Sequence, residues 1–185
     1  MLKRILCALL AMLLLTGAAL GESLMAFEDY AAALDAPADA EWTADGDVRM
    51  LELADEATVS VCLEDENVMA VTVEAPKGSI MDAGSAALKA LGAMTDEEIA
   101  ELLAMTEAGS AEVDACAFWR MLGKKREGIA VCAAEDAPSL FWIPVHGGKK
   151  FHVRMGCSGM DVARLVTRKA AEEAGLEPCG RCKNR

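Results

Sequence analysis

The sequence predicts an α+β fold: an antiparallel sheet with helices on one face, in the order ββ-αα-ββ, followed by a small zinc-stapled module built from a hairpin and a helix. Three observations lead to this prediction. Two pairs of apolar segments are each interrupted by a short polar turn, which is typical of β-hairpins. Two helical segments lie between these pairs. Three Cys and one His follow near the C-terminus of the 185-residue chain, with a spacing that suits a metal ion.

The first segment, Met1–Gly21, has the pattern of a secretion signal. Lys3 and Arg4 precede an unbroken apolar run, Ile5–Leu15, and small residues lead to an expected cleavage after Gly21. The run is shorter than the ~20 residues that a membrane-spanning helix needs. We therefore expect the signal to be removed, leaving a secreted, extracytoplasmic protein without a stable membrane span.

The rest of the chain consists of an acidic part followed by a basic part. Residues 22–137 carry 7 basic and 26 acidic residues, a net of −19, whereas residues 138–185 carry 9 basic and 4 acidic residues, a net of +5. The composition changes at Ala137-Pro138, which we take as a domain boundary. Residues 22–57 are expected to form an N-terminal helix, Met25–Leu34, and a polar connector that includes Ala36–Asp47. Residues 58–137 are expected to form the acidic α+β domain.

Within the acidic domain, alternating apolar residues predict the strands. The first hairpin comprises Val59–Leu63 and Val68–Glu74 around a turn at Asp65-Glu66-Asn67; the second comprises Cys116–Leu122 and Gly128–Ala134 around Gly123–Glu127. Between them, Met81–Leu91 is expected to be helical. A second helix is expected to begin after the N-cap Thr95 and to run to about Met105.

This domain shows no pattern that predicts catalysis. It has no Gly-rich phosphate loop, and both His of the chain, His146 and His152, lie in the tail; two His in total also exclude a His-rich metal enzyme. The net charge of −12 argues against a protein that coats nucleic acid with its whole surface. Cys62 and Cys132 are either buried thiols or are joined by a disulfide. In the second case Cys116 would be left without a partner.

The tail contains its own predicted elements. Gly147-Gly148 separates Phe141–Val145 from Lys150–Val153, which predicts a hairpin, and we interpret His146 as a plain turn residue. Thr167 is expected to cap a helix that ends near Gly175.

Four residues of the tail, His152, Cys157, Cys179 and Cys182, have the spacing H-x4-C-x21-C-x2-C. A Cys3His set matches a closed, tetrahedral, structural zinc site, and a segment this small gains from a metal because it cannot bury a large core. Two alternatives remain. Cys179 and Cys182 could form a disulfide, with Cys157 paired elsewhere, or they could be a redox pair like the CGxC of thioredoxins, although that pair precedes a helix and this one follows a helix.

About the last 45 residues also resemble a known module. The segments that carry the resemblance are GKKFH, CSGM and AAEEAGLEPCGRC, which begin at Gly148, Cys157 and Ala170. They are similar to a small zinc-binding module at the ends of secreted proteins of Gram-positive bacteria, related to the metal-binding domain of Ada-type DNA-repair proteins. The resemblance implies zinc on the four residues above, with His152 at the first ligand position. It implies no methyl-acceptor activity, because that activity needs an all-thiolate site. No family is identified for residues 22–137.

Several functions are compatible with this sequence. The absence of a catalytic set favours an exported, non-enzymatic binding or interaction protein with a protein or cell-surface ligand and a structural zinc site. One alternative is an accessory protein that binds nucleic acid or another polyanion through the basic tail (Lys149, Lys150, Arg154, Arg164, Arg168, Lys169 and Arg181). Another is a thiol-disulfide redox protein that uses Cys179 and Cys182. A zinc-activated water would need an open coordination position, which four protein ligands would fill.

Overall fold

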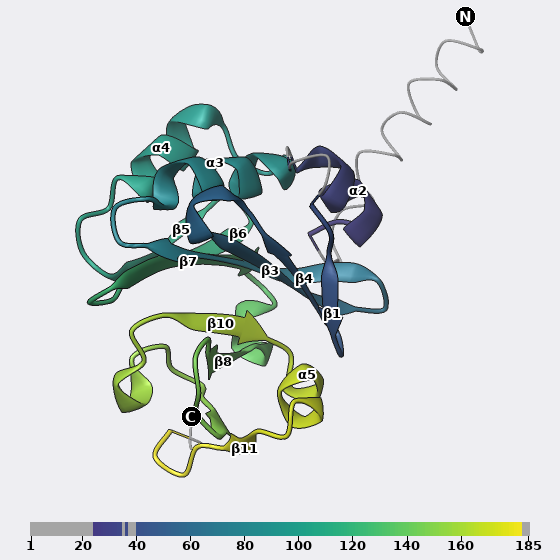
Figure 1. Ribbon diagram of the computed structural model, residues 1–185, viewed down its shortest axis with the longest axis vertical. Coiled ribbons are helices and arrows are strands. Elements are labelled where there is room, and N and C mark those ends of the chain that lie inside the picture. The colour runs from purple at the N-terminus through teal and green to yellow at the C-terminus, as the bar shows by residue number, and fades with distance from the viewer. Residues whose placement is uncertain (1–23, 35, 37–39, 183–185) are drawn as a thin grey trace, which may run out of the picture.

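The computed structural model describes residues 24–34, 36 and 40–182 (Figure 1). The predicted signal segment, Met1–Gly21, lies outside these residues. No helix in the described part of the chain is both long and apolar enough to cross a membrane. The helices are α2 (Phe27–Ala33), α3 (Ile80–Ala90), α4 (Asp96–Leu103) and α5 (Arg168–Glu173). The strands are β1 (Thr43–Asp45), β2 (Val48–Glu52), β3 (Thr58–Glu64), β4 (Asn67–Pro76), β5 (Gly109–Val113), β6 (Cys116–Leu122), β7 (Arg126–Ala133), β8 (Phe141–Pro144), β9 (Lys150–Phe151), β10 (Ala163–Val166) and β11 (Glu177–Pro178).

A seven-stranded antiparallel sheet forms the centre of the molecule, in the order β1-β2-β3-β4-β7-β6-β5. The predicted hairpins are β3–β4 and β6–β7, and they join through the pairing of β4 with β7. Asp65 and Glu66 in the first turn have φ of 50° and 64°. Such a turn twists in the same sense as the strands beside it. The predicted α+β class is therefore confirmed.

Three strands of the sheet were not expected from the sequence. β1 and β2 form a hairpin where residues 22–57 were expected to hold only a helix and a connector, and β5 adds an edge strand beside β6. All residues of β1 are exposed, and β5 alternates between exposed and partly exposed positions. Edge strands of this kind bury little apolar surface, so their hydrophobic pattern is weak.

The helices α2, α3 and α4 cover one face of the sheet (Figure 1). Their buried side chains, among them Tyr30, Leu88 and Ile99, join a core with Val61 and Val131 of the sheet. The predicted N-cap Thr95 begins α4 with a capping box: its hydroxyl accepts from the Glu98 N–H, and the Glu98 carboxylate accepts from the Thr95 N–H at 2.7 Å. The helix ends at Leu103, two residues before the expected end.

A buried ion pair ties α3 to the sheet. Arg120 Nη2 on β6 donates to Glu127 Oε2 on β7 at 2.6 Å, and both side chains are about 5% exposed. The other carboxylate oxygen accepts from the N–H groups of Gly78 and Ile80, where α3 begins. Burial alone would raise the pKa of Glu127, but these hydrogen bonds and the Arg120 charge outweigh it and lower the pKa.

The opposite face of the sheet is covered by a second layer, residues 138–182, which we call the C-terminal layer (Figure 1). The sheet contributes mostly small residues to this interface: Cys62, Ala70, Ala117, Ala130 and Cys132. The C-terminal layer contributes larger ones, including Trp142, Phe151 and Leu165. The Leu165 N–H donates to Thr72 Oγ1 at 3.2 Å, and the Thr167 N–H donates to Cys62 Sγ at 3.3 Å. The central strands are therefore buried on both faces.

Candidate metal centre

His152 is positioned by the predicted tail hairpin. Beyond the turn at Gly147 and Gly148, the backbones of Trp142 and His152 exchange two hydrogen bonds, of 2.7 and 2.8 Å. Both glycines have positive φ, of 67° and 97°, as the tight turn requires. The pairing is short, because β8 forms its longer ladder with β10 on its other side. His152 itself is only 4% exposed.

Cys157 follows the hairpin in a short 3-10 turn, Cys157–Gly159. Its N–H donates to the Arg154 carbonyl at 3.2 Å, which folds the chain back toward His152.

Cys179 and Cys182 follow the predicted helix. Thr167 caps α5 by accepting from the Ala170 N–H, and Gly175 ends the helix with φ of 74°. The next residues form β11, which pairs with β9 in parallel, and the Cys179 N–H donates to the Phe151 carbonyl at 2.9 Å. The Cys182 N–H then donates to the Cys179 carbonyl, which closes a tight turn between the two thiols.

The structure brings all four predicted ligand residues together. One ligand atom from each of His152, Cys157, Cys179 and Cys182 lies within 4.8 Å of the others, close enough to hold a metal ion. Cys157 Sγ and Cys179 Sγ are 3.8 Å apart, and Cys182 Sγ and His152 Nδ1 are 3.7 Å apart. A tetrahedral ion with bonds of about 2.3 Å to sulfur and 2.0–2.1 Å to nitrogen would separate such pairs by about 3.8 and 3.6 Å. These two spacings match those around one tetrahedral ion, and the other donor separations in the group are at most 4.8 Å.

The electrostatic surroundings favour ligand-competent forms for two of the four groups. The backbone N–H of Arg181 hydrogen-bonds the Cys179 sulfur and is the main reason that its pKa falls to about 7. Burial, helped by the charge of Lys150, lowers the pKa of His152, which favours the neutral imidazole that a metal ion needs. Burial raises the pKa of Cys182, so a metal ion would displace a proton from this thiol.

The other candidate residues lie away from this group. His146 is on the exposed loop before Gly147, with Nε2 3.7 Å from Glu74 Oε2. Cys62 and Cys132 each pair with Ala70 in the sheet, from opposite sides. Two strand spacings therefore separate them, about 9.5 Å, which is too far for a disulfide.

No disulfide forms among the six cysteines of the described residues. Burial raises the pKa of Cys62 to about 11 and of Cys132 to about 12, as expected for inert core thiols.

The backbone partners of the centre could not be found from the sequence. The carbonyls of Phe151 and Trp142 fix Cys179 and His152, yet a carbonyl acceptor leaves no signature in residue type. Comparison with protein-family models, with curated proteins and with solved structures finds no match for this chain. The resemblance of the tail to an Ada-type zinc module therefore stays a prediction.

Proposed function

We propose that the chain is an exported, non-enzymatic binding protein whose C-terminal layer is held in shape by a structural zinc ion. The observation that carries the proposal is the Cys3His group itself, whose ligand atoms all lie within 4.8 Å of one another and of which two pairs have the separation expected around a tetrahedral ion. Thiolate and imidazole ligands suit zinc, and four protein ligands describe a structural rather than a catalytic site.

The position of the four residues supports a structural role. His152 comes from the hairpin, Cys157 from the turn that follows, and Cys179 and Cys182 from the segment after α5. One ion would join these three pieces of chain. The last piece has little else to hold it, because only Cys179, Cys182 and, in part, Leu176 are buried between residues 175 and 182.

Export adds a chemical reason for a bound ion. Thiols outside the cytoplasm tend to oxidise to disulfides, whereas thiolates bound to zinc would be protected. The signal pattern of Met1–Gly21 supports the location. The same reasoning separates this proposal from the redox alternative, in which Cys179 and Cys182 would cycle between thiols and a disulfide.

The test is the metal content and thiol reactivity of the mature protein, purified without chelator and without added metal. We expect one equivalent of zinc per chain, with Cys157, Cys179 and Cys182 protected from alkylation until the metal is chelated. Cys179→Ser should lose the zinc, whereas the control Cys116→Ala, which changes a buried thiol of the sheet, should keep it. A metal-free protein in which Cys179 and Cys182 oxidise reversibly would overturn the proposal.

A further inference from the structure

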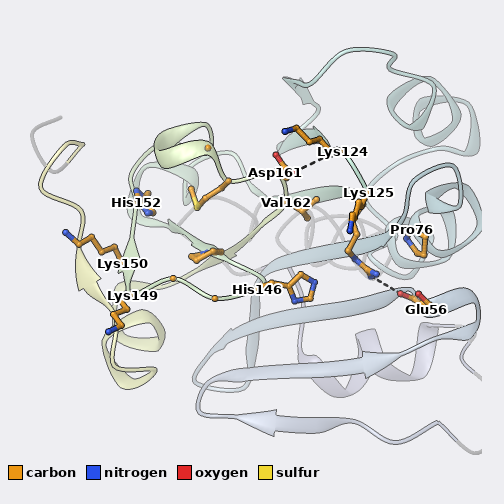
Figure 2. Close-up of a pocket in the computed structure, with 16 residues that line it drawn as sticks. Glu56, Pro76, Lys124, Lys125, His146, Lys149, Lys150, His152, Asp161 and Val162 are labelled. Atoms are coloured by element: carbon orange, nitrogen blue, oxygen red, sulfur yellow. Dashed lines mark hydrogen bonds between the residues drawn. The ribbon is translucent and has the colours of Figure 1, made fainter.

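A pocket of about 920 Å³ lies between the C-terminal layer and one end of the sheet (Figure 2). One wall is the loop that leads from β8 to β9, residues 144–150, together with residues 159–162. The other wall is the β6–β7 turn, Lys124–Arg126, with Glu56 and Pro76 beside it. The N–H of Lys124 donates to Asp161 Oδ2 at 3.4 Å, which links the two walls at one edge. The size is that of a site for a small molecule.

The pocket is basic although the chain is acidic. Five Lys and Arg residues line it, against Glu56 and Asp161, whereas the whole chain has a net charge of −12. Arg126 is neutralised, because its Nε lies 3.0 Å from Glu74 Oε2. Lys124 and Lys125, by contrast, are exposed and form no salt bridge with any described residue.

The side chains differ in direction. Figure 2 shows Lys125 and His146 on the facing sides of the space between the turn and the loop, whereas Lys149 and Lys150 extend away from both. The positive charge available to a ligand therefore comes from the β6–β7 turn. Lys149 and Lys150, two of the seven basic tail residues that the sequence suggested for a polyanion, contribute little side-chain charge to the interior.

Apart from His146 and His152, the remaining lining is apolar or is backbone. Pro76, Pro144, Met160 and Val162 supply carbon surface. Gly148 lies so close to Pro144 that an added Cβ would be 2.4 Å from its Cγ, so only glycine lets the loop follow this path. Within the described residues, the N–H groups of Gly147 and Gly148 donate to no protein acceptor, so they are available to an anion or to water.

From these features we infer that the pocket binds a small organic anion. A carboxylate or phosphate head would contact Lys124, Lys125 and the amides of the glycine turn, and an apolar part would pack on Met160 and Val162. A half-open pocket of this volume suits a small molecule better than a nucleic acid, which would need a basic path along the surface, and the acidic remainder of the chain would repel a polyanion. The inference rests on the proposed function, because two of the proposed ligands, His152 and Cys157, lie in the chain between the two segments that form this wall.

The test is a titration of the full mature protein with phenyl phosphate, which combines a dianionic head with an apolar ring, followed by NMR and calorimetry. Inorganic phosphate provides the head alone and benzyl alcohol the ring alone. We expect phenyl phosphate to bind more tightly than either, to shift the amide signals of Gly147, Gly148 and Lys125, and to bind more weakly as salt is added. Zinc content is measured on every sample.

The double variant Lys124→Gln/Lys125→Gln should weaken binding by roughly threefold or more, as the loss of two exposed charge contacts predicts. The matched control is Lys89→Gln, which removes one charge from α3 on the other face of the sheet, where Lys89 pairs only with exposed Asp96; its affinity should equal that of the wild type. Zinc-loaded protein that binds no phenyl phosphate, or binds it equally well without Lys124 and Lys125, would overturn this inference and leave the metal proposal intact. Binding of a DNA duplex that competes out phenyl phosphate would overturn it in favour of a polyanion site. Metal-free protein would instead contradict the proposed function.

Discussion

Removal of the proposed metal ion is expected to release residues 175–182 and to leave the seven-stranded sheet folded. This segment follows α5 and contains β11, Cys179 and Cys182. Its contacts other than the metal ligands are few: the half-buried Leu176 and backbone hydrogen bonds such as those from Glu177 to Lys149 and from Cys179 to Phe151.

The magnitudes decide the outcome. Ordering roughly eight residues costs on the order of 8–16 kcal/mol in backbone entropy. A few backbone hydrogen bonds return about 1 kcal/mol each, so they cannot hold the segment by themselves. A structural zinc ion contributes about 10–16 kcal/mol at neutral pH, which matches the deficit. The sheet has no such dependence, since its strands are buried between two layers of side chains.

The assay is amide hydrogen exchange with and without EDTA, in the presence of a reductant that keeps the thiols from forming disulfides. Chelation should abolish protection at Cys179 and Cys182, whereas the amides of Val71 and Val131 in the central strands should stay protected. Unchanged protection of residues 175–182 after complete metal removal would refute the reasoning. Loss of protection throughout β4 and β7 would refute it in the other direction, because the metal would then support the whole fold.

Three further predictions concern single residues. Glu127→Gln leaves the buried Arg120 without its counter-charge and should reduce the free energy of unfolding by about 3–5 kcal/mol in urea titrations. Because the pKa of Glu127 is lowered from 4.5 in the folded state, its contribution to stability is complete above pH 4.5 and is lost as the pH falls through the folded value; the variant should lack this part of the acid dependence. Thr167→Ala removes the N-cap of α5 and should lower the denaturation midpoint by an amount equal to about 1 kcal/mol, with the zinc content unchanged. Gly148→Ala would place a Cβ against Pro144 at a φ of 97°, and should cost about 1–3 kcal/mol and shift the NMR signals of the loop; a fully stable variant would show that the loop can rearrange freely.

The elements with strong local signals could be predicted from the sequence. The two central hairpins, the capping box at Thr95 and the cap at Thr167 each depend on residues close together in the chain. The candidate metal centre belongs to the same class, because its four residues come in two short motifs, and the turn that ends at Cys157 lies only a few residues after His152. For elements formed by residues close together in the chain, the local sequence contains most of the information that determines their geometry.

The packing of the C-terminal layer on the second face of the sheet could not be predicted from the sequence. Ser60 and Thr72 alternate with valines, a pattern that indicates strands with one solvent-exposed face. In the structure both side chains lie beneath the C-terminal layer and are at most 3% exposed. A small polar residue looks the same in a sequence whether water or another layer covers it. The basic pocket has a similar cause, because Lys124 and Gly148 become neighbours only through this packing.

The small residues at the interface between the sheet and the C-terminal layer also affect the period of synthesis in which the sheet exists without that layer. The contacts of Leu165 with Thr72 and of Thr167 with Cys62 join positions 93 and 105 residues apart, so β3 and β4 leave the ribosome long before their cover does. Until then, this face of the sheet presents mostly alanine, cysteine, serine and threonine, and its large apolar side chains, among them Met69, Met121 and Trp119, are few. Such a face offers other chains less apolar area for aggregation than a face of leucine and phenylalanine would, since the gain from contact scales with the apolar surface removed from water. Of the large aromatic residues at this interface, Trp142 and Phe151 arrive with the segment that buries them. Trp119, whose ring lies 5.3 Å from that of Trp142, is already part of the sheet.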